Sequence, residues 1–195
     1  MSFYQKLGLI LLKTTINQQQ GMGNGKSIKV ILDSDVIIHF IKGGCLNLLP
    51  KILPMYSFVI LNMVYDHELA AAHRVIIQNT VNLLKTITIE EWVPQKEERQ
   101  EFIILQKKFG LGESASMVYC KYRNDVLASS NLKDIVDYCE ENKITYFTTM
   151  DFLYQAMVSK VMTEKECDRF IAEVTSKGSK LPVTKMGGFT PRLRL

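Results

Sequence analysis

The sequence predicts an α/β fold, with a mainly parallel sheet that is flanked by helices on both faces. Short apolar runs alternate along the chain with longer segments that have helical patterning. Residues 30–32 and 126–128 are apolar at every position, as expected for strands that are covered on both faces. Polar residues that can begin a helix follow each of these runs. Together these features predict βα units whose strands lie parallel in one sheet.

Composition limits the classes of protein to which the chain can belong. Its 195 residues are enough for one domain with a sizeable core, and its formal charge of +4 tolerates a polyanionic partner without requiring one. The four cysteines form no CxxC pair and no secretion signal is convincing, so we expect a reducing, cytoplasmic location. No apolar run approaches the roughly 20 residues of a membrane span, so we expect no membrane insertion.

The two ends of the chain differ from its middle. We expect residues 1–27 to form a flexible leader, residues 28–182 one domain, and residues 183–195 a basic tail that is disordered or contacts a phosphate or a partner. The glycines of the leader do not form a P-loop. That motif needs four residues between its glycines and a strand before them, whereas three residues separate Gly21 from Gly25 and the strand comes afterwards.

The first half of the domain contains three of the expected strands. Residues 29–32 form the first one, which stops at Asp33, and Ser34 or Asp35 can cap the helix that follows. The remaining elements of this half are a short helix limited by Pro50 and Pro54, a strand at 56–61, a helix capped by Asn62 that runs from residue 63 to about 84, a strand at 86–89, and a helix ending at Gly110.

The second half repeats the alternation. The expected elements are a helix that begins near Glu113, a buried strand at 126–128, a helix capped by Asn131, a strand at 145–148, a helix capped by Thr149 or Asp151, and a last helix opened by a capping box at 163–166 and ended by Gly178.

Three acids stand where strands end or helices begin. A carboxylate just past a parallel strand, such as Asp33, lies in the crevice where open α/β sheets bind ligands; the alternative is that Asp33 and Asp35 only form the turn. Glu113 falls in the first turn of a helix, where the dipole alone favours an acid. Asp134 stands three residues after Asn131, as in an N-cap pair, so capping is its alternative role.

These three acids can meet at one edge of the predicted sheet. Clustered carboxylates repel one another, so a cation is needed to hold them together, and hard oxygen ligands select Mg²⁺ or Mn²⁺. Such metals activate water and stabilise the charge that develops in phosphodiester cleavage. Asp33, Glu113 and Asp134 are therefore the candidate metal ligands. A zinc site is not expected, because His67 and His73 are six residues apart rather than four.

Over about residues 28–182, the chain resembles the PIN-domain nucleases, including the toxin ribonucleases of toxin–antitoxin pairs. The motifs that carry the resemblance are VILDSDVII, from residue 30, and GLGESA, from residue 110. The resemblance implies a metal-dependent endoribonuclease with catalytic acids at Asp33, Glu68, Glu113 and Asp134. Asp66 lies close to Glu68 and competes with it for the second of these positions.

The resemblance also implies the substrate side and the partners. Ser34, Ser130 and Asn131 are the substrate-side candidates, and the partners are RNA, an antitoxin protein and a second copy of the chain. The sequence departs from the family pattern at Asn131, where many members carry an aspartate. Two classes of function therefore remain open, namely a metal-dependent ribonuclease and a catalytically degenerate module that binds RNA or protein.

Overall fold

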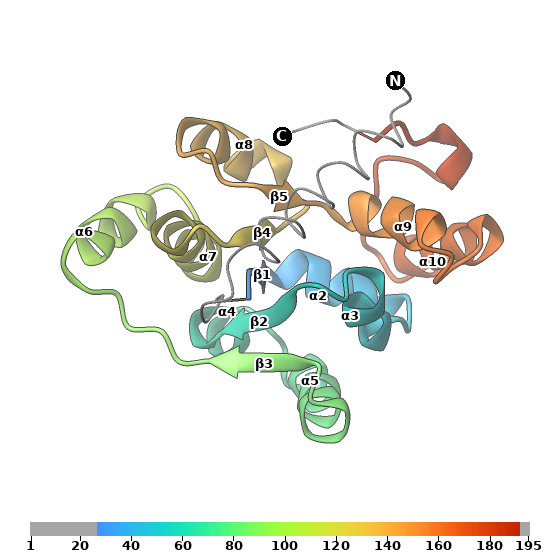
Figure 1. Cartoon of the computed structure of the whole chain (residues 1–195), viewed down its shortest axis with the longest axis horizontal. Helices are drawn as coiled ribbons and strands as arrows, with labels where there is room; N and C mark the ends of the chain where they lie inside the picture. Colours follow the sequence, from blue (N-terminus) through green and yellow to red (C-terminus); the bar gives the residue numbers. More distant parts are fainter. Residues whose placement is uncertain (1–26, 192–195) are drawn as a thin grey trace, which may run out of the picture.

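The computed structural model describes residues 27–191, and in this range five parallel strands form one sheet in the order β3-β2-β1-β4-β5 (Figure 1). The predicted α/β class is therefore confirmed, as is the prediction that the strands expected to end at Leu32, Ala128 and Thr148 are neighbours, although the last of them ends at Phe147. The strands are β1 (Lys29–Leu32), β2 (Ser57–Leu61), β3 (Ile87–Glu90), β4 (Val126–Ala128) and β5 (Tyr146–Phe147).

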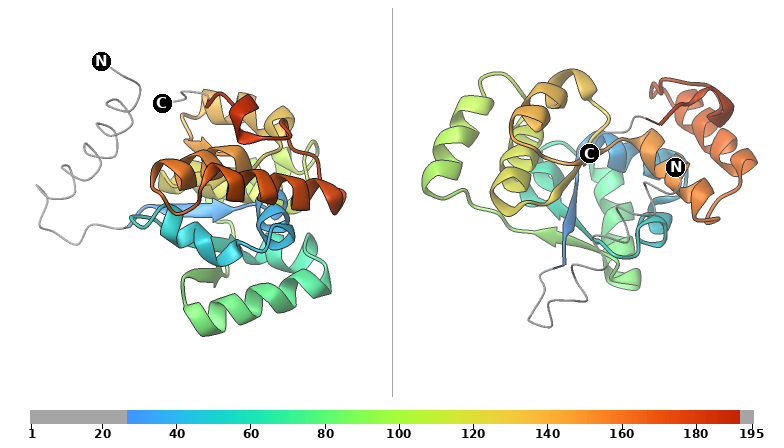
Figure 2. Two further views of the ribbon diagram at one scale, coloured as in Figure 1. Left: turned by 90° about the vertical axis from the view of Figure 1, so that its right-hand side faces the viewer. Right: turned by 45° about the horizontal axis from the view of Figure 1, so that its top comes forward.

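Helices cover both faces of the sheet, which explains why β1 is apolar at every position. Val30 and Leu32 belong to one hydrophobic core and Ile31 to the other, since successive side chains of a strand point to opposite faces. Figure 1 shows the two helical layers on either side of the strands, and they remain separate in the right-hand view of Figure 2. One layer contains α2 (Ser34–Lys42), α3 (Leu49–Ile52), α5 (Ala71–Leu84), α9 (Thr149–Val158) and α10 (Glu164–Ser176); the other contains α6 (Lys96–Leu105), α7 (Leu111–Arg123) and α8 (Leu132–Glu141).

The prediction of a single helix from residue 63 to about 84 is wrong. The structure divides it into α4 (Asn62–His67) and α5, with Glu68 at the end of α4 and buried Leu69 in the break. Asn62 is the first residue of α4 rather than its cap, and its side-chain oxygen instead accepts a hydrogen bond from Trp92 N (3.1 Å). The break turns the chain so that Glu68 lies against α7.

Several predicted helix ends differ from the structure. Asp33, rather than Ser34 or Asp35, is the N-cap of α2, because its carboxylate accepts from the Ser34 backbone. Gly110 does not end α6, which stops at Leu105; it is the N-cap of α7. Pro50 lies in the first turn of α3, where a missing N–H costs nothing.

Two capping boxes fix the last helices. Thr148, rather than Thr149 or Asp151, is the N-cap of α9, and its partner in the box is Asp151. The predicted capping box at 163–166 is confirmed, with Thr163 as the N-cap of α10.

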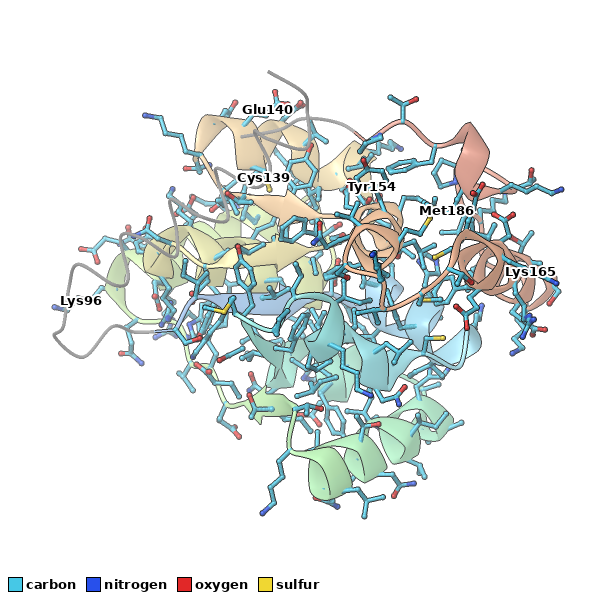
Figure 3. The ribbon with its side chains drawn as sticks, turned by 45° about the vertical axis from the view of Figure 1, so that its right-hand side comes forward. Lys96, Cys139, Glu140, Tyr154, Lys165 and Met186 are labelled. Carbon is cyan, nitrogen blue, oxygen red and sulfur yellow. The ribbon has the colours of Figure 1, made fainter. Side chains whose placement is uncertain are left out.

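Beyond α10 the chain folds back onto the domain. Residues 183–191 include the short 3₁₀ helix η2 (Met186–Gly188), in which Met186 is buried and its N–H donates to Asp168 Oδ1 (2.7 Å; Figure 3). The expectations for the leader, the glycine-rich stretch at 21–26 and the cations Arg192 and Arg194 lie outside the described residues. Within residues 27–191, every helix is too short or too polar to span a membrane.

Candidate functional site

The site lies at the carboxyl edge of the sheet, where β1 and β4 end side by side. Asp33 directly follows β1, and its N–H donates to the carbonyl of Ala128 at the end of β4 (2.9 Å). Its carboxylate accepts hydrogen bonds from the Ser34 N–H (2.8 Å) and from the side chain of Ser129. The strand register therefore places the buried Asp33 carboxylate beside the turn at 129–131.

Glu68 reaches the same edge from the break between α4 and α5. Its Oε1 accepts the N–H of Gly112 in the first turn of α7 (2.7 Å). A Cβ atom on Gly112 would lie 2.6 Å from Glu68 Cδ, so a side chain at position 112 would displace the Glu68 carboxylate from this place. Asp66, the competing acid, is exposed. The geometry thus favours Glu68 over Asp66 at this position. Glu113 directly follows Gly112 in the sequence.

Asn131 lies between two acids of the site. Its Nδ2 donates both to Glu113 Oε1 (3.0 Å) and to Asp134 Oδ2 (2.6 Å). Both neighbours are carboxylates, so the amide must present its NH₂ group to them. Although Asn131 is the N-cap of α8, its side chain makes no capping hydrogen bond. The Asp134 carboxylate therefore accepts a hydrogen bond from the Asn131 side chain instead of taking part in a capping pair.

Asp35 supports the turn that presents Asn131, a role that the sequence did not reveal. Its Oδ2 accepts the N–H of Ser130 (2.7 Å), while Ser130 Oγ donates to Thr149 Oγ1 (2.9 Å) and accepts from Thr149 N (2.9 Å). Thr149 Oγ1 in turn contacts Nδ1 of buried His39 (2.8 Å). Burial, followed by the charge of Lys42, lowers the pKa of His39 to about 4, so the ring is neutral near pH 7 and its tautomer decides whether Nδ1 donates to Thr149 Oγ1 or accepts from it.

Burial and neighbouring acids raise the pKa values of Asp33 and Glu113. Burial raises the pKa of Glu113 to about 7, and the charges of Asp33 and Asp134 add to the rise. Burial raises the pKa of Asp33 above its ordinary range as well, with further contributions from Asp35 and Glu68. Within residues 27–191, none of these acids forms an ion pair with a basic side chain. The cluster is therefore electrostatically uncompensated.

The site matches a hard metal ion in ligand type but not in arrangement. Its side chains offer carboxylate and amide oxygens, which suit Mg²⁺ or Mn²⁺. Among the residues that the structure describes, however, no group of three or more His, Cys, Asp and Glu side chains is arranged to hold a metal ion. The amide of Asn131 lies between the carboxylates of Glu113 and Asp134 instead.

Comparisons with known proteins assign neither a family nor a function. No family model matches the chain, and no curated protein does. A solved structure of a PilT N-terminus domain protein from the hyperthermophilic archaeon Sulfolobus solfataricus P2 is similar, with a TM-score of 0.41 and 12% sequence identity. The match covers 67% of this chain and 94% of that one.

Proposed function

We propose that the protein is a metal-dependent endoribonuclease that hydrolyses RNA phosphodiester bonds at the carboxyl edge of its sheet. The observation that supports this proposal most is the gathering of Asp33, Glu68, Glu113 and Asp134 from four separate segments, where no ion pair within residues 27–191 joins any of them to a basic side chain. A folded protein keeps uncompensated buried acids at a cost in stability. The cost is explained if the acids serve a ligand of opposite charge.

The residues of the site divide into three roles. Asp33, Glu113 and Asp134 would hold Mg²⁺ or Mn²⁺ once the Asn131 amide moves out from between Glu113 and Asp134, and the bound ion would activate water and stabilise the charge that develops on the phosphate. Glu68 fixes the first turn of α7, and hence Glu113, through its bond to Gly112 N. Ser34, Ser130 and Asn131 lie at the same edge of the sheet and are the substrate-side candidates; the Ser34 hydroxyl can donate to a phosphate oxygen, whereas Ser130 Oγ and Asn131 Nδ2 would first have to give up their bonds to Thr149, Glu113 and Asp134.

A second candidate function has its own supporting observation. The Asn131 amide already bridges Glu113 and Asp134 without any cation, which favours a degenerate PIN-like module that binds RNA or a protein and does not cut. The toxin assignment, an antitoxin partner and a homodimer stay predictions drawn from the resemblance to PIN-domain nucleases. Such a partner is expected to lay an apolar helix into a groove of this domain.

An RNase assay with a divalent metal separates the two candidates. We expect the purified protein to cleave single-stranded RNA with Mn²⁺ or Mg²⁺, to lose the activity in EDTA, and to lose it in Asp33→Asn. The matched control is Asp137→Asn, which removes an exposed acid of α8 and should leave cleavage unchanged. Cleavage of single-stranded DNA alone would contradict the RNA assignment.

The Asn131→Asp variant tests the degenerate alternative directly. If wild-type protein does not cleave and shows no thermal shift with Mn²⁺, whereas Asn131→Asp gains both properties, Asn131 is what prevents metal binding. Full cleavage by both Asp33→Asn and Glu113→Gln would contradict the nuclease proposal.

A further inference from the structure

Helix α5 presents an apolar stripe to solvent. Its outward face carries Ala72, Val75, Ile76 and Leu83, separated by Asn79, at the spacing of successive helical turns. Val75 is 61% exposed and Leu83 is 81% exposed. The opposite face packs on the sheet through Ile77, which is fully buried. Helix α5 is therefore apolar on both sides, although the described residues cover only one.

This outward face also lacks charge, unlike the face of a solvated helix. Within α5 the only Lys, Arg, Asp or Glu is Arg74, which is half-buried and donates to the carbonyl of Asp66 (3.0 Å). Helix α10, by contrast, exposes Glu164, Lys165 and Arg169; Figure 3 marks Lys165 at the surface. An exposed apolar patch without charges is typical of a surface that another segment covers.

The chain outside the described residues starts close to this surface. Ser27 Oγ contacts Ser57 Oγ (3.1 Å) at the start of β2, and β2 pairs with β3, whose first residue Ile87 follows α5 closely in the sequence. β1 and β3 are two strand spacings apart, which is roughly 10 Å. The last turn of α5 and the point at which residue 26 joins the domain therefore lie at the same amino edge of the sheet.

The preceding sequence has both the composition and the length to cover α5. Residues 7–12, LGLILL, form a continuous run without charge, and the 14 residues at 13–26 that join this run to Ser27 are mostly polar or glycine. A chain of 14 residues spans roughly 21 Å on average as a random coil and at most about 50 Å when fully extended. Helix α5, with 14 residues, is about 21 Å long. The run can thus reach every turn of the exposed stripe.

We infer that residues 7–12 of the same chain dock on the outward face of α5. A second copy fits this surface less well, since a stripe about 21 Å long and about 10 Å wide falls far short of the ~800 Å² that each partner buries in a stable complex. A tethered segment needs no such area, because its linker gives it an effective concentration in the millimolar range. The docking covers two apolar surfaces of one chain at once.

Photo-crosslinking in the full chain tests the docking. With p-benzoylphenylalanine in place of Leu9, we expect crosslinks to peptides of residues 71–84 within a single chain. Crosslinks between two chains would instead identify the face as a dimer interface. Both that result and the absence of any crosslink to α5 would overturn the inference.

Hydrogen exchange provides a second readout. We expect Leu9→Asp with Leu11→Asp to raise amide exchange in α5 about tenfold and to leave α10 unchanged. Ile104→Asp is the matched control, because Ile104 is 58% exposed on a different helix and should leave exchange in α5 unchanged. In a Val75→Asp background the Leu9 and Leu11 substitutions should cause no further rise in the amide exchange of α5, because Val75→Asp has already removed the same contact. Unchanged exchange of α5 in the Leu9 and Leu11 variant would contradict the docking.

Discussion

The two ends of helix α7 carry acidic clusters of opposite character. At its first turn, Glu113 lies among Asp33, Glu68 and Asp134, and in the described part of the chain it forms no ion pair with a basic side chain. At its last turn, Lys121 contacts Glu101 (2.6 Å) and Arg123 contacts Glu98 (2.5 Å), both on α6. The helix dipole favours an acid at the first turn and cations at the last, so it accounts for both ends equally. What separates the two ends is whether the acids are paired.

The pKa values show the same difference. Burial raises the pKa of Glu101, but hydrogen bonds from Lys121 and Tyr138 outweigh it and leave the pKa below its ordinary value. Glu90 behaves alike, through Lys29 and Tyr119. For Glu113, burial and neighbouring acids act in the same direction and the pKa rises to about 7. The charged forms of Glu90 and Glu101 are thus favoured by the folded protein, whereas the charged form of Glu113 is disfavoured and would be favoured by a cationic ligand.

The largest expected effect is on catalysis at the first turn. Glu113→Gln should lower the proposed metal-dependent cleavage at least about 100-fold, because it removes the negative charge of a carboxylate that would help to hold the metal ion. In EDTA its melting temperature should equal or exceed that of the wild type, since one repulsive charge is gone. Glu101→Gln at the other end should show the reverse pattern, with cleavage retained and stability lowered. If both variants behaved alike, the distinction between the two ends would be lost.

Gly112→Ala tests the close approach of Glu68 to α7. The added Cβ would lie 2.6 Å from Glu68 Cδ, and we expect a loss of about 1–3 kcal/mol in the free energy of unfolding, measured in urea. In a Glu68→Ala background the same substitution should become neutral or stabilising by up to about 1 kcal/mol, because alanine is the better helix former. Equal losses in the two backgrounds would mean that Glu68 does not restrict the position.

The pH dependence of metal-free stability should differ for the two ends. Glu113 has a pKa of about 7 in the folded protein against an ordinary value of 4.5, so between these limits the folded state binds more protons than the unfolded one. The free energy of unfolding should therefore fall, by on the order of 1 kcal/mol, as pH rises from about 4.5 to about 7.

The Glu113→Gln variant and added Mn²⁺ test whether Glu113 causes this fall in the free energy of unfolding. The lowered pKa values of Glu90 and Glu101 act below pH 4.5, where their stabilisation is lost as pH decreases. Denaturation series in EDTA should show the decline above pH 4.5 in the wild type and a weaker one in Glu113→Gln. Mn²⁺ should reverse the decline near pH 7. A flat profile for the wild type would contradict the raised pKa.

The smallest effect is expected at the last turn. Arg123→Met breaks the pair with Glu98 but keeps an apolar side chain against the Tyr119 ring, which lies 4.2 Å from the guanidinium. Because the pair is partly exposed, the expected cost is below about 1 kcal/mol and decreases at high salt. Thermal unfolding at low and high ionic strength measures it. A loss as large as that of Gly112→Ala would show that α7 depends equally on both ends.

The sequence predicted the strands better than the helix ends. The strand at 126–128 agrees with β4 residue by residue, because a run that is apolar at every position has a clear end. The break after Glu68 could not be found, since the surrounding residues are helix formers without a glycine or proline. The break follows from tertiary packing, with Leu69 buried and Glu68 bonded to α7.

The site was predictable only in its outline. The ends of β1 and β4 indicated where Asp33 and the turn at 129–131 would lie, because parallel strands share one carboxyl edge. The contacts of Asp35 and Thr149 with Ser130 join residues 95 and 19 positions apart. Spacing along the chain carries no signal for such contacts. Sequence spacing also could not show that the Asn131 amide bridges two acids rather than capping α8.

The central position of β1 has a consequence for protein synthesis. Its partner β2 follows within 30 residues, whereas its other partner, β4, begins only at Val126. At about 5–20 residues per second, the ribosome needs roughly 2–7 s to translate from Glu90 to Val126. Throughout that interval the apolar β1 has an open edge that can pair with other nascent chains. A message truncated before codon 126 therefore yields an aggregation-prone three-stranded product that lacks Asn131 and Asp134.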